Sequence, residues 1–303
     1  MTVFNGLNIW PRLSATAIIA NLLFSAPILI YAQDSERETD QATQLATIDF
    51  VVGNAVFILL HEFGHVVIRD FDIPILGLEE NAADTLAAIG LILADENQSE
   101  RQPRLSEYLA MAVLGNLLIW QTGIEKSSNE ILFWAQHEVS VRRATRLVCL
   151  LYGSDTREFG WLAEAVEMPE SRRDVCEDEF TIARNAAEKV LATFGKSVED
   201  NPELERTEIE VKYGRPRNPT QARLLEVIQE TQLMETVAKR IRNRWVLPDS
   251  VTLRVRSCPS ANAYWDEDYR ELIFCLELLE ALEKIGSGPE VQRLKANFAK
   301  ARD

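Results

Sequence analysis

Positive charge is scarce in this sequence. Only 32 Lys and Arg residues stand against 47 Asp and Glu residues, which gives a formal net charge of −15 at pH 7. Nucleic acids and anionic membranes are bound through clusters of Lys and Arg side chains. We therefore expect no nucleic acid as a partner, and no membrane contact beyond the N-terminal segment. The composition is otherwise that of an ordinary globular protein, with 47% hydrophobic and 26% charged residues.

Charge is absent from residues 13–32. This apolar stretch follows a single charged side chain, Arg12, and acidic residues begin at Asp34. The order is typical of a secretory signal peptide that is cleaved after Ala32. An uncleaved N-terminal anchor is the alternative, because the apolar run is long. In either case residues 33–303 are expected outside the cytoplasm, in the periplasm or secreted.

Cysteine is rare as well, and no two cysteines have the C-x-x-C spacing of a structural zinc site. The four residues are Cys149, Cys176, Cys258 and Cys275. An even number in an exported chain favours disulfides, although four cysteines allow three different pairings. Joining Cys149 to Cys176 and Cys258 to Cys275 closes the shortest loops. Four buried free thiols are the less expected alternative.

The chain is patterned mainly for helices and contains no internal repeat or low-complexity segment. Residues 48–68 are apolar nearly all round, which predicts a helix buried in a core. We expect this run to be too short to span a bilayer, and too interrupted by Gly53, Asn54 and ionisable residues. A turn is predicted at residues 74–77, with a second helix from Leu78. Further helices are predicted at residues 105–121, 139–152 and 173–194.

The C-terminal third mixes helix and strand signals. Residues 197–220 are polar and contain prolines, which predicts a connection between subregions with a strand at residues 209–213. A helix is predicted over residues 222–245. Two β-rich runs follow at residues 251–256 and 272–274. We therefore predict a mainly helical α+β fold, with residues 33–303 as one domain.

Histidine is the scarcest residue with metal-binding chemistry, with three in the whole chain. Two of them, His61 and His65, flank Glu62 in an H-E-x-x-H motif. Residues four apart lie on one face of a helix, so both imidazoles can be directed at a single zinc ion. Glu62 lies beside that point and is the candidate general base. A pair of ordinary core histidines is the alternative.

A catalytic zinc site needs a third protein ligand and leaves one position for water. The second predicted helix offers Glu80, with Asp84 four positions later on the same face. We predict that Glu80 is the third ligand and that Asp84 accepts the remaining N–H of a ligating histidine. Glu79 is the rival for the ligand role, but it does not share a face with Asp84. Alternatively, Glu79, Glu80 and Asp84 are solvent-exposed acids that only stabilise the first turn of a helix through its dipole.

These segments carry a family resemblance. The motif at residues 61–65 and the segment at residues 73–84 resemble a bacterial family of putative metallopeptidases that is classed as a domain of unknown function. The likeness continues at residues 134–137, 149–153 and 258–275 and around Cys176, and so covers most of the chain after residue 32. It implies a zincin-type site on the residues named above and supports both cysteine pairs. Phe63 stands where Leu is common and Trp265 where Tyr is common, and neither should disturb ligation.

The sequence thus favours a metallopeptidase that uses Zn²⁺ and Glu62 to hydrolyse a peptide or protein substrate. A developing oxyanion needs a further donor, for which His137, Tyr152 and Tyr264 are candidates. A helix-capping role for His137 is an equal alternative. The competing function is a non-catalytic exported domain that binds metal or a partner. An intramembrane protease is disfavoured, because it needs several membrane spans.

Overall fold

The computed structural model describes residues 28–96, 105–121, 140–195, 205, 207–289, 291 and 293. The chain divides into two units, Met1–Asp40 and Gln41–Asp303. All contacts described below belong to the second unit. Residues 1–27 of the predicted signal segment lie outside the described part, residues 28–32 belong to the helix that begins at Ile28, and the cleavage after Ala32 stays a prediction.

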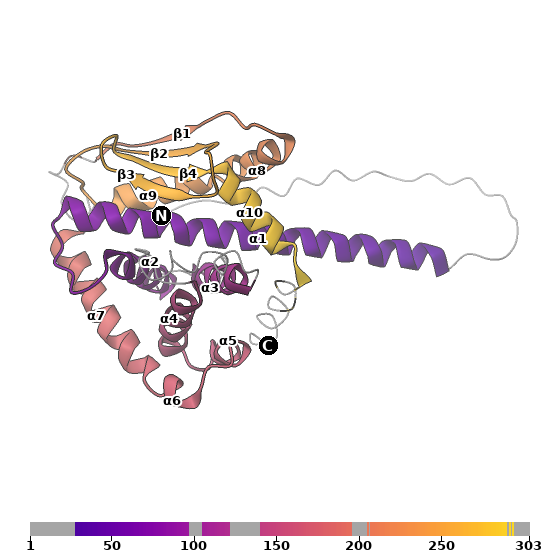
Figure 1. Ribbon diagram of the computed structural model, residues 1–303, viewed down its shortest axis with the longest axis horizontal. Helices are drawn as coiled ribbons and strands as arrows, with labels where there is room; N and C mark the ends of the chain where they lie inside the picture. Colours follow the sequence, from indigo (N-terminus) through magenta and orange to yellow (C-terminus); the bar gives the residue numbers. More distant parts are fainter. Residues whose placement is uncertain are drawn as a thin grey trace, which may run out of the picture. The chain divides into compact units, whose positions relative to one another are not determined.

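Ten helices and four strands make up the described part of the chain, in agreement with the predicted mainly helical α+β fold (Figure 1). The helices are α1 (Ile28–Asp70), α2 (Glu79–Glu96), α3 (Leu105–Gln121), α4 (Ser140–Ser154), α5 (Gly160–Ala165), α6 (Glu170–Arg173), α7 (Cys176–Phe194), α8 (Pro219–Glu230), α9 (Leu233–Arg244) and α10 (Leu276–Gly286). The strands are β1 (Ile209–Tyr213), β2 (Val251–Arg256), β3 (Ala263–Asp266) and β4 (Glu271–Cys275).

The predicted helix over residues 222–245 is wrong in one respect, because two helices occupy this range. The break lies at Gln232, whose φ of 50° is left-handed and cannot continue an α-helix. The break lets the two halves pack separately, so that α8 contacts α10 and α9 contacts β1. Helices α5, α6 and α10 and strand β3 were not predicted at all.

The four strands form one mixed sheet in the order β1-β2-β4-β3. β1 and β4 both pair with β2 in parallel, whereas β3 pairs with β4 antiparallel. In β2 the side chains alternate, with Val251, Leu253 and Val255 buried. The strand predicted at residues 209–213 is confirmed as β1, which is an edge strand of this sheet.

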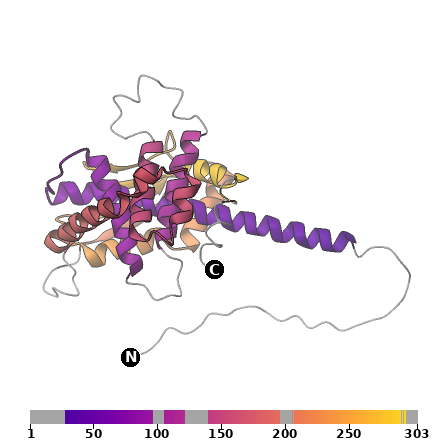
Figure 2. The same cartoon turned by 90° about the horizontal axis from the view of Figure 1, so that it is seen from below.

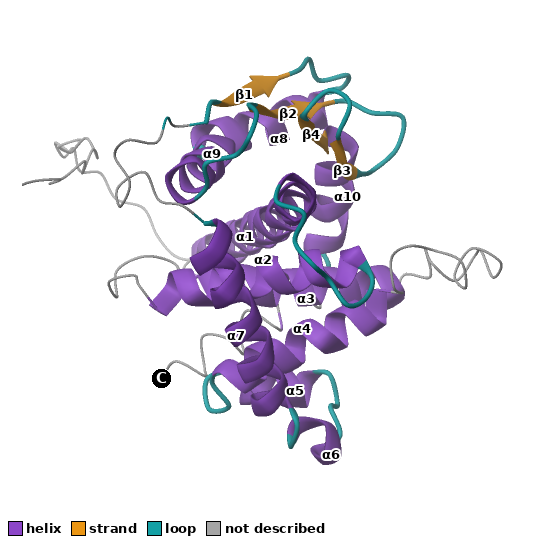
Figure 3. Cartoon of the chain, turned by 90° about the vertical axis from the view of Figure 1, so that its left-hand side faces the viewer, coloured by secondary structure: helices purple, strands orange, loops and turns teal. Residues whose placement is uncertain are grey.

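The part of α1 that belongs to the second unit, residues 41–70, lies between two layers. The sheet with α8 and α9 lies on one side, and α2, α3 and α4 lie on the other (Figures 1 and 3). Figure 2, seen from below, places α4 and α7 in front of α1, which agrees with this layering. Asn54, the polar residue within the apolar run, donates from its side-chain amide to the carbonyls of Phe50 and Met111, both at 2.9 Å. The polar interruption in α1 is therefore satisfied inside the core.

The expectation that the run at residues 48–68 is too short to span a bilayer does not hold for the helix that contains it. Gln44–Asp70 is long and apolar enough by length and composition, with a mean hydropathy of 1.7 in its most apolar window. However, 83% of that window is buried inside the protein. One such helix is weak evidence for a membrane span, because the core helix of a folded domain passes the same test.

Both predicted disulfides are confirmed. Cys149 of α4 is bonded to Cys176 at the start of α7, with Cα atoms 5.0 Å apart. Cys258 is bonded to Cys275 at the end of β4, with Cα atoms 5.4 Å apart. Disulfides persist in oxidising compartments, so the two bonds indicate an oxidising, extracellular environment.

Candidate metal centre

The candidate metal centre lies where α1 and α2 approach each other closely. Gly64 lies between the two histidines of the motif, and a Cβ placed there would lie 3.0 Å from Ala83 Cα and 3.1 Å from Ala83 Cβ. Such distances are shorter than ordinary carbon contacts. A glycine facing an alanine therefore lets the backbone of α2 come near enough for its first turn to reach His61 and His65.

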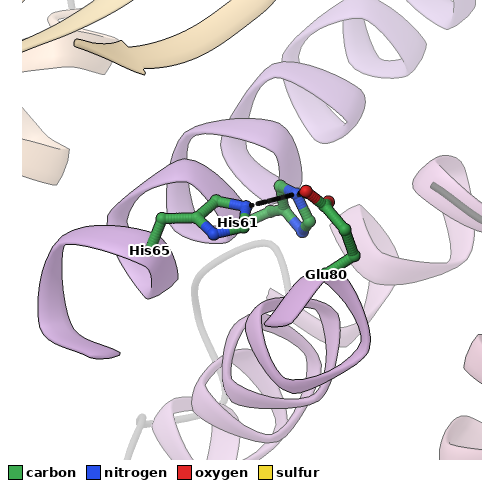
Figure 4. Close-up of side chains that lie close together, drawn as sticks. All are labelled: His61, His65 and Glu80. Carbon is green, nitrogen blue, oxygen red and sulfur yellow. Dashed lines mark hydrogen bonds and ion pairs between the residues drawn. The ribbon is translucent and has the colours of Figure 1, made fainter. Parts of the chain in front are cut away.

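Three side chains converge at this crossing, as Figure 4 shows. The Nε2 atoms of His61 and His65 are 3.3 Å apart. Glu80 Oε2 lies 3.2 Å from Nε2 of His61, and Glu80 Oε1 lies 3.6 Å from Nε2 of His65. All ligand atoms of this group lie within 4.8 Å of one another. The structure therefore brings together the three residues that were predicted as metal ligands.

The donor set and its spacing fit a zinc ion. Zinc accepts imidazole nitrogen and carboxylate oxygen at about 2.0 to 2.2 Å in tetrahedral sites, so neighbouring ligand atoms are about 3.3 Å apart. The distances of 3.2 and 3.3 Å at His61 match this spacing, and 3.6 Å at His65 is close to it. Two imidazoles and one carboxylate also form the ligand set of catalytic rather than structural zinc sites.

The other ring nitrogen of His61 faces a buried carboxylate. Nδ1 of His61 lies 2.8 Å from Asp84 Oδ1, and the Asp84 side chain is 1% exposed. Arg143 donates to both oxygens of Asp84, with Nε at 3.0 Å and Nη2 at 2.6 Å, and Nη2 of Arg146 lies at 3.3 Å. Asp84 therefore orients His61 and is itself held by two arginines from α4.

His65 has a similar but more exposed partner. Nδ1 of His65 lies 2.7 Å from Glu79 Oε1. Nε of Arg69 donates to the same oxygen of Glu79 at 3.0 Å, and Nη1 of Arg69 donates to Glu267 at 2.6 Å. Glu79 thus contacts the side of the ring away from the converging Nε2 atoms. This arrangement favours Glu80 over Glu79 as the third ligand.

The carboxylates make this site favourable for positive charge. Burial lowers the pKa of His61, but hydrogen bonds with Asp84 and Glu80 outweigh burial and raise the pKa to about 9. Burial likewise opposes protonation of His65, whereas contacts with Glu80 and Glu79 raise its pKa. Burial would raise the pKa of Asp84, but His61 and Arg143 hold it well below its usual range. A pocket that draws positive charge to two imidazoles also suits a cation.

The other predicted site residues are Glu62, Tyr152, Tyr264 and His137. Glu62 is buried, with 8% exposure. Burial lowers the pKa of Arg143, but the charges of Asp84, Glu80 and Glu62 outweigh burial and raise it. Tyr264 accepts a hydrogen bond from Arg256 at 2.9 Å and packs beside the Cys258–Cys275 disulfide. Among the described residues, no hydrogen bond joins Tyr264 or Tyr152 to the three converging side chains. His137 lies outside the described residues, so its role stays a prediction.

Sequence reasoning missed the arginines that hold the two carboxylates. Arg143 and Arg146 are three positions apart on α4, which places them on one face of that helix. Arg69 follows His65 by four positions on α1, which places it one turn further along the face of the histidines. These spacings were available in the sequence. Their partners were not, because Asp84 precedes Arg143 by 59 positions.

Comparison with known proteins points to the same chemistry. The family described as putative metallopeptidase matches residues 23–191 and 213–302. These ranges include the H-E-x-x-H motif, the acidic turn of α2, α4 and both disulfides. No curated protein and no solved structure matches the chain. Because the family match spans most of the sequence, the chain belongs to the putative metallopeptidase family.

Proposed function

We propose that the protein is an exported zinc-dependent peptidase. His61, His65 and Glu80 hold the metal ion, and Glu62 is the general base. The observation that carries the proposal is the convergence of two imidazole nitrogens and one carboxylate at a spacing suited to zinc. Membership of the metallopeptidase family supports the same activity at a coarser level.

The reaction is the addition of water to a peptide carbonyl, followed by loss of the amine. Zinc, when bound, acts as a Lewis acid and lowers the pKa of water to about 7. Glu62 directly follows His61 on α1 and therefore flanks the face that both imidazoles share. Its carboxylate accepts a proton as the water oxygen forms a bond to the carbonyl carbon. The same carboxyl group returns that proton to the leaving nitrogen when the C–N bond breaks.

Asp84 and Glu79 prepare the two imidazoles for ligation. Each carboxylate lies within 2.8 Å of an Nδ1 atom, where it can accept a hydrogen bond from Nδ1–H. That hydrogen bond fixes the tautomer with the proton on Nδ1 and leaves Nε2 available to a metal. The arginines that hold each carboxylate keep the rings from turning away. Asp84 and Glu79 therefore orient the two ligating imidazoles and are not themselves metal ligands.

The test measures zinc content and peptide hydrolysis on the same samples of the purified chain. Glu62→Gln is nearly isosteric, so it should keep the fold and the metal while losing activity by about 10²- to 10⁴-fold. Glu177→Gln, an exposed glutamate on α7, is the matched control and should cleave at the parental rate. A broad peptide library serves as substrate, and a chelator should abolish cleavage by the parent.

Two results would overturn the proposal. If Glu62→Gln retained zinc and cleaved at the parental rate, the assignment of the general base would be wrong. If the parent held zinc but cleaved nothing in the library, a non-catalytic exported domain that binds metal or a partner would be the better description.

A further inference from the structure

A second candidate site lies on the other side of the α1–α2 pair. A groove of about 870 Å³ is lined by α1, α2, α7 and α9. Its walls include Leu60, Phe63 and Val67 of α1 and Trp245 after α9. Its volume is in the range of small-molecule sites, about 300 to 1,000 Å³, which are mostly apolar with a few polar groups. The groove therefore has the size and the lining of a ligand site.

The groove is kept open by a glycine. Gly90 lies in the middle of α2, lines the groove and is exposed, and a Cβ placed there would meet no atom within 4 Å. Glycine is among the least favourable residues in a helix interior. At Gly64 a side chain is excluded because Ala83 lies too close. At Gly90 no neighbouring atom excludes a side chain. Gly90 therefore leaves the groove open at this point of α2, because it has no side chain to fill the space.

The lining of the groove also carries positive charge. Arg240 and Arg244 line it from α9, one turn apart and both exposed. Neither arginine forms an ion pair with a residue in the described part of the chain. The third arginine of the lining, Arg184, is already paired, since it contacts Glu96 at 2.5 Å and Glu188 at 2.8 Å. In a protein with a net charge of −15, two arginines that have no ion-pair partner among the described residues and lie beside an apolar groove favour an anionic ligand.

We propose that this groove binds a long-chain fatty acid. The acyl chain lies along the apolar wall past Gly90, and the carboxylate contacts Arg240 and Arg244. Burial of the chain supplies the affinity, and charge-assisted hydrogen bonds from the guanidinium groups fix its orientation. This site uses none of the metal-binding residues and does not depend on the proposed peptidase activity.

The probe is cis-parinaric acid, a fluorescent long-chain fatty acid, titrated into the purified chain. Gly90→Leu extends a side chain into the groove and should weaken binding by about tenfold or more. Gly160→Leu is the matched control, since a Cβ at this second helical glycine also meets no atom within 4 Å but Gly160 does not line the groove. The control should bind as the parent does. Circular dichroism and thermal unfolding verify that both variants are folded.

Charge and metal are tested separately. The double variant Arg240→Gln/Arg244→Gln should bind the acidic probe more weakly; with the measured probe affinity of each protein taken into account, the inhibition constant of palmitic acid should rise and that of the neutral hexadecanol should stay unchanged. Glu80→Ala, with its altered metal centre, should bind the probe as the parent does. Absence of saturable binding to the parent, or parental affinity in folded Gly90→Leu, would overturn the proposal. Equal loss of acid and alcohol binding in the arginine variant would overturn the placement of the carboxylate.

Discussion

The two histidines of the candidate metal centre are held by carboxylates in contrasting surroundings. On one side lies an inner network of Asp84, Arg143 and Arg146, in which the Asp84 side chain is 1% exposed and that of Arg143 is 18% exposed. On the other lies an outer network of Glu79, Arg69 and Glu267, with exposures of 28%, 49% and 61%. Both networks place a carboxylate oxygen within 2.8 Å of an Nδ1 atom.

Similar geometry in the two networks does not mean similar energy. Removal of one partner from a buried ion pair leaves an uncompensated charge away from water, which is strongly destabilising. Removal of one partner from an exposed pair exposes the other to water at little cost. The inner network should therefore contribute to the fold as well as to the orientation of His61. The outer network should contribute mainly to the orientation of His65.

The largest effect is expected for Asp84→Ala. This change leaves Arg143 and Arg146 without their shared carboxylate, and the free energy of unfolding should fall by about 3 to 5 kcal/mol. Denaturant unfolding with a chelator present measures this loss without a contribution from metal. The double variant Asp84→Ala/Arg143→Met should recover part of the loss, because it removes the uncompensated cation. A loss below about 1 kcal/mol for Asp84→Ala, which is the range of exposed pairs, would mean that burial does not distinguish the networks.

Glu79→Ala should have a smaller effect on stability than on metal binding. The free energy of unfolding should change by about 0 to 1 kcal/mol, since Glu79 and Arg69 are 28% and 49% exposed and water can reach the remaining charge. Zinc affinity should fall by about tenfold, at the lower end of what loss of an outer partner of a ligating histidine costs. Competition with a chromophoric chelator measures the affinity. An unfolding loss as large as that of Asp84→Ala would contradict the contrast between the networks.

Glu267→Gln should have the smallest effect. Glu267 contacts only Arg69 in the outer network and is the most exposed of the three residues. We expect a stability change within about 0.5 kcal/mol, as for an ordinary surface substitution, and parental zinc affinity. If zinc affinity fell as far as in Glu79→Ala, the outer network would act as one unit that extends to the turn before β4.

The side chains of the candidate metal centre could be predicted from the sequence because they depend on helical spacing. His61 and His65 are four positions apart on α1, and Glu80 and Asp84 are four positions apart on α2. Such spacing fixes which side chains share a face before any tertiary contact is known. The fold class, most helix positions and both disulfides followed from local patterns in the same way.

The features that were missed depend on long-range packing. The contact between Arg143 and Asp84 joins two helices that are distant in the sequence, and no local pattern specifies which helix faces which. The break at Gln232 was missed because glutamine is an ordinary helix residue, and its left-handed φ arises from the separate packing of α8 and α9. The apolar groove depends in the same way on α9 lying beside α2 and α7.

Competitive zinc titration of the parent, Glu80→Ala and Glu79→Ala tests the metal centre most directly. Glu80 lies 3.2 Å from Nε2 of His61, on the side where the ligand atoms converge, whereas Glu79 contacts Nδ1 of His65. Removal of a ligand should cost far more affinity than removal of an orienting partner, so Glu80→Ala should bind zinc much more weakly than Glu79→Ala. Parental affinity in Glu80→Ala, or the reverse order of the two variants, would contradict the metal centre described above.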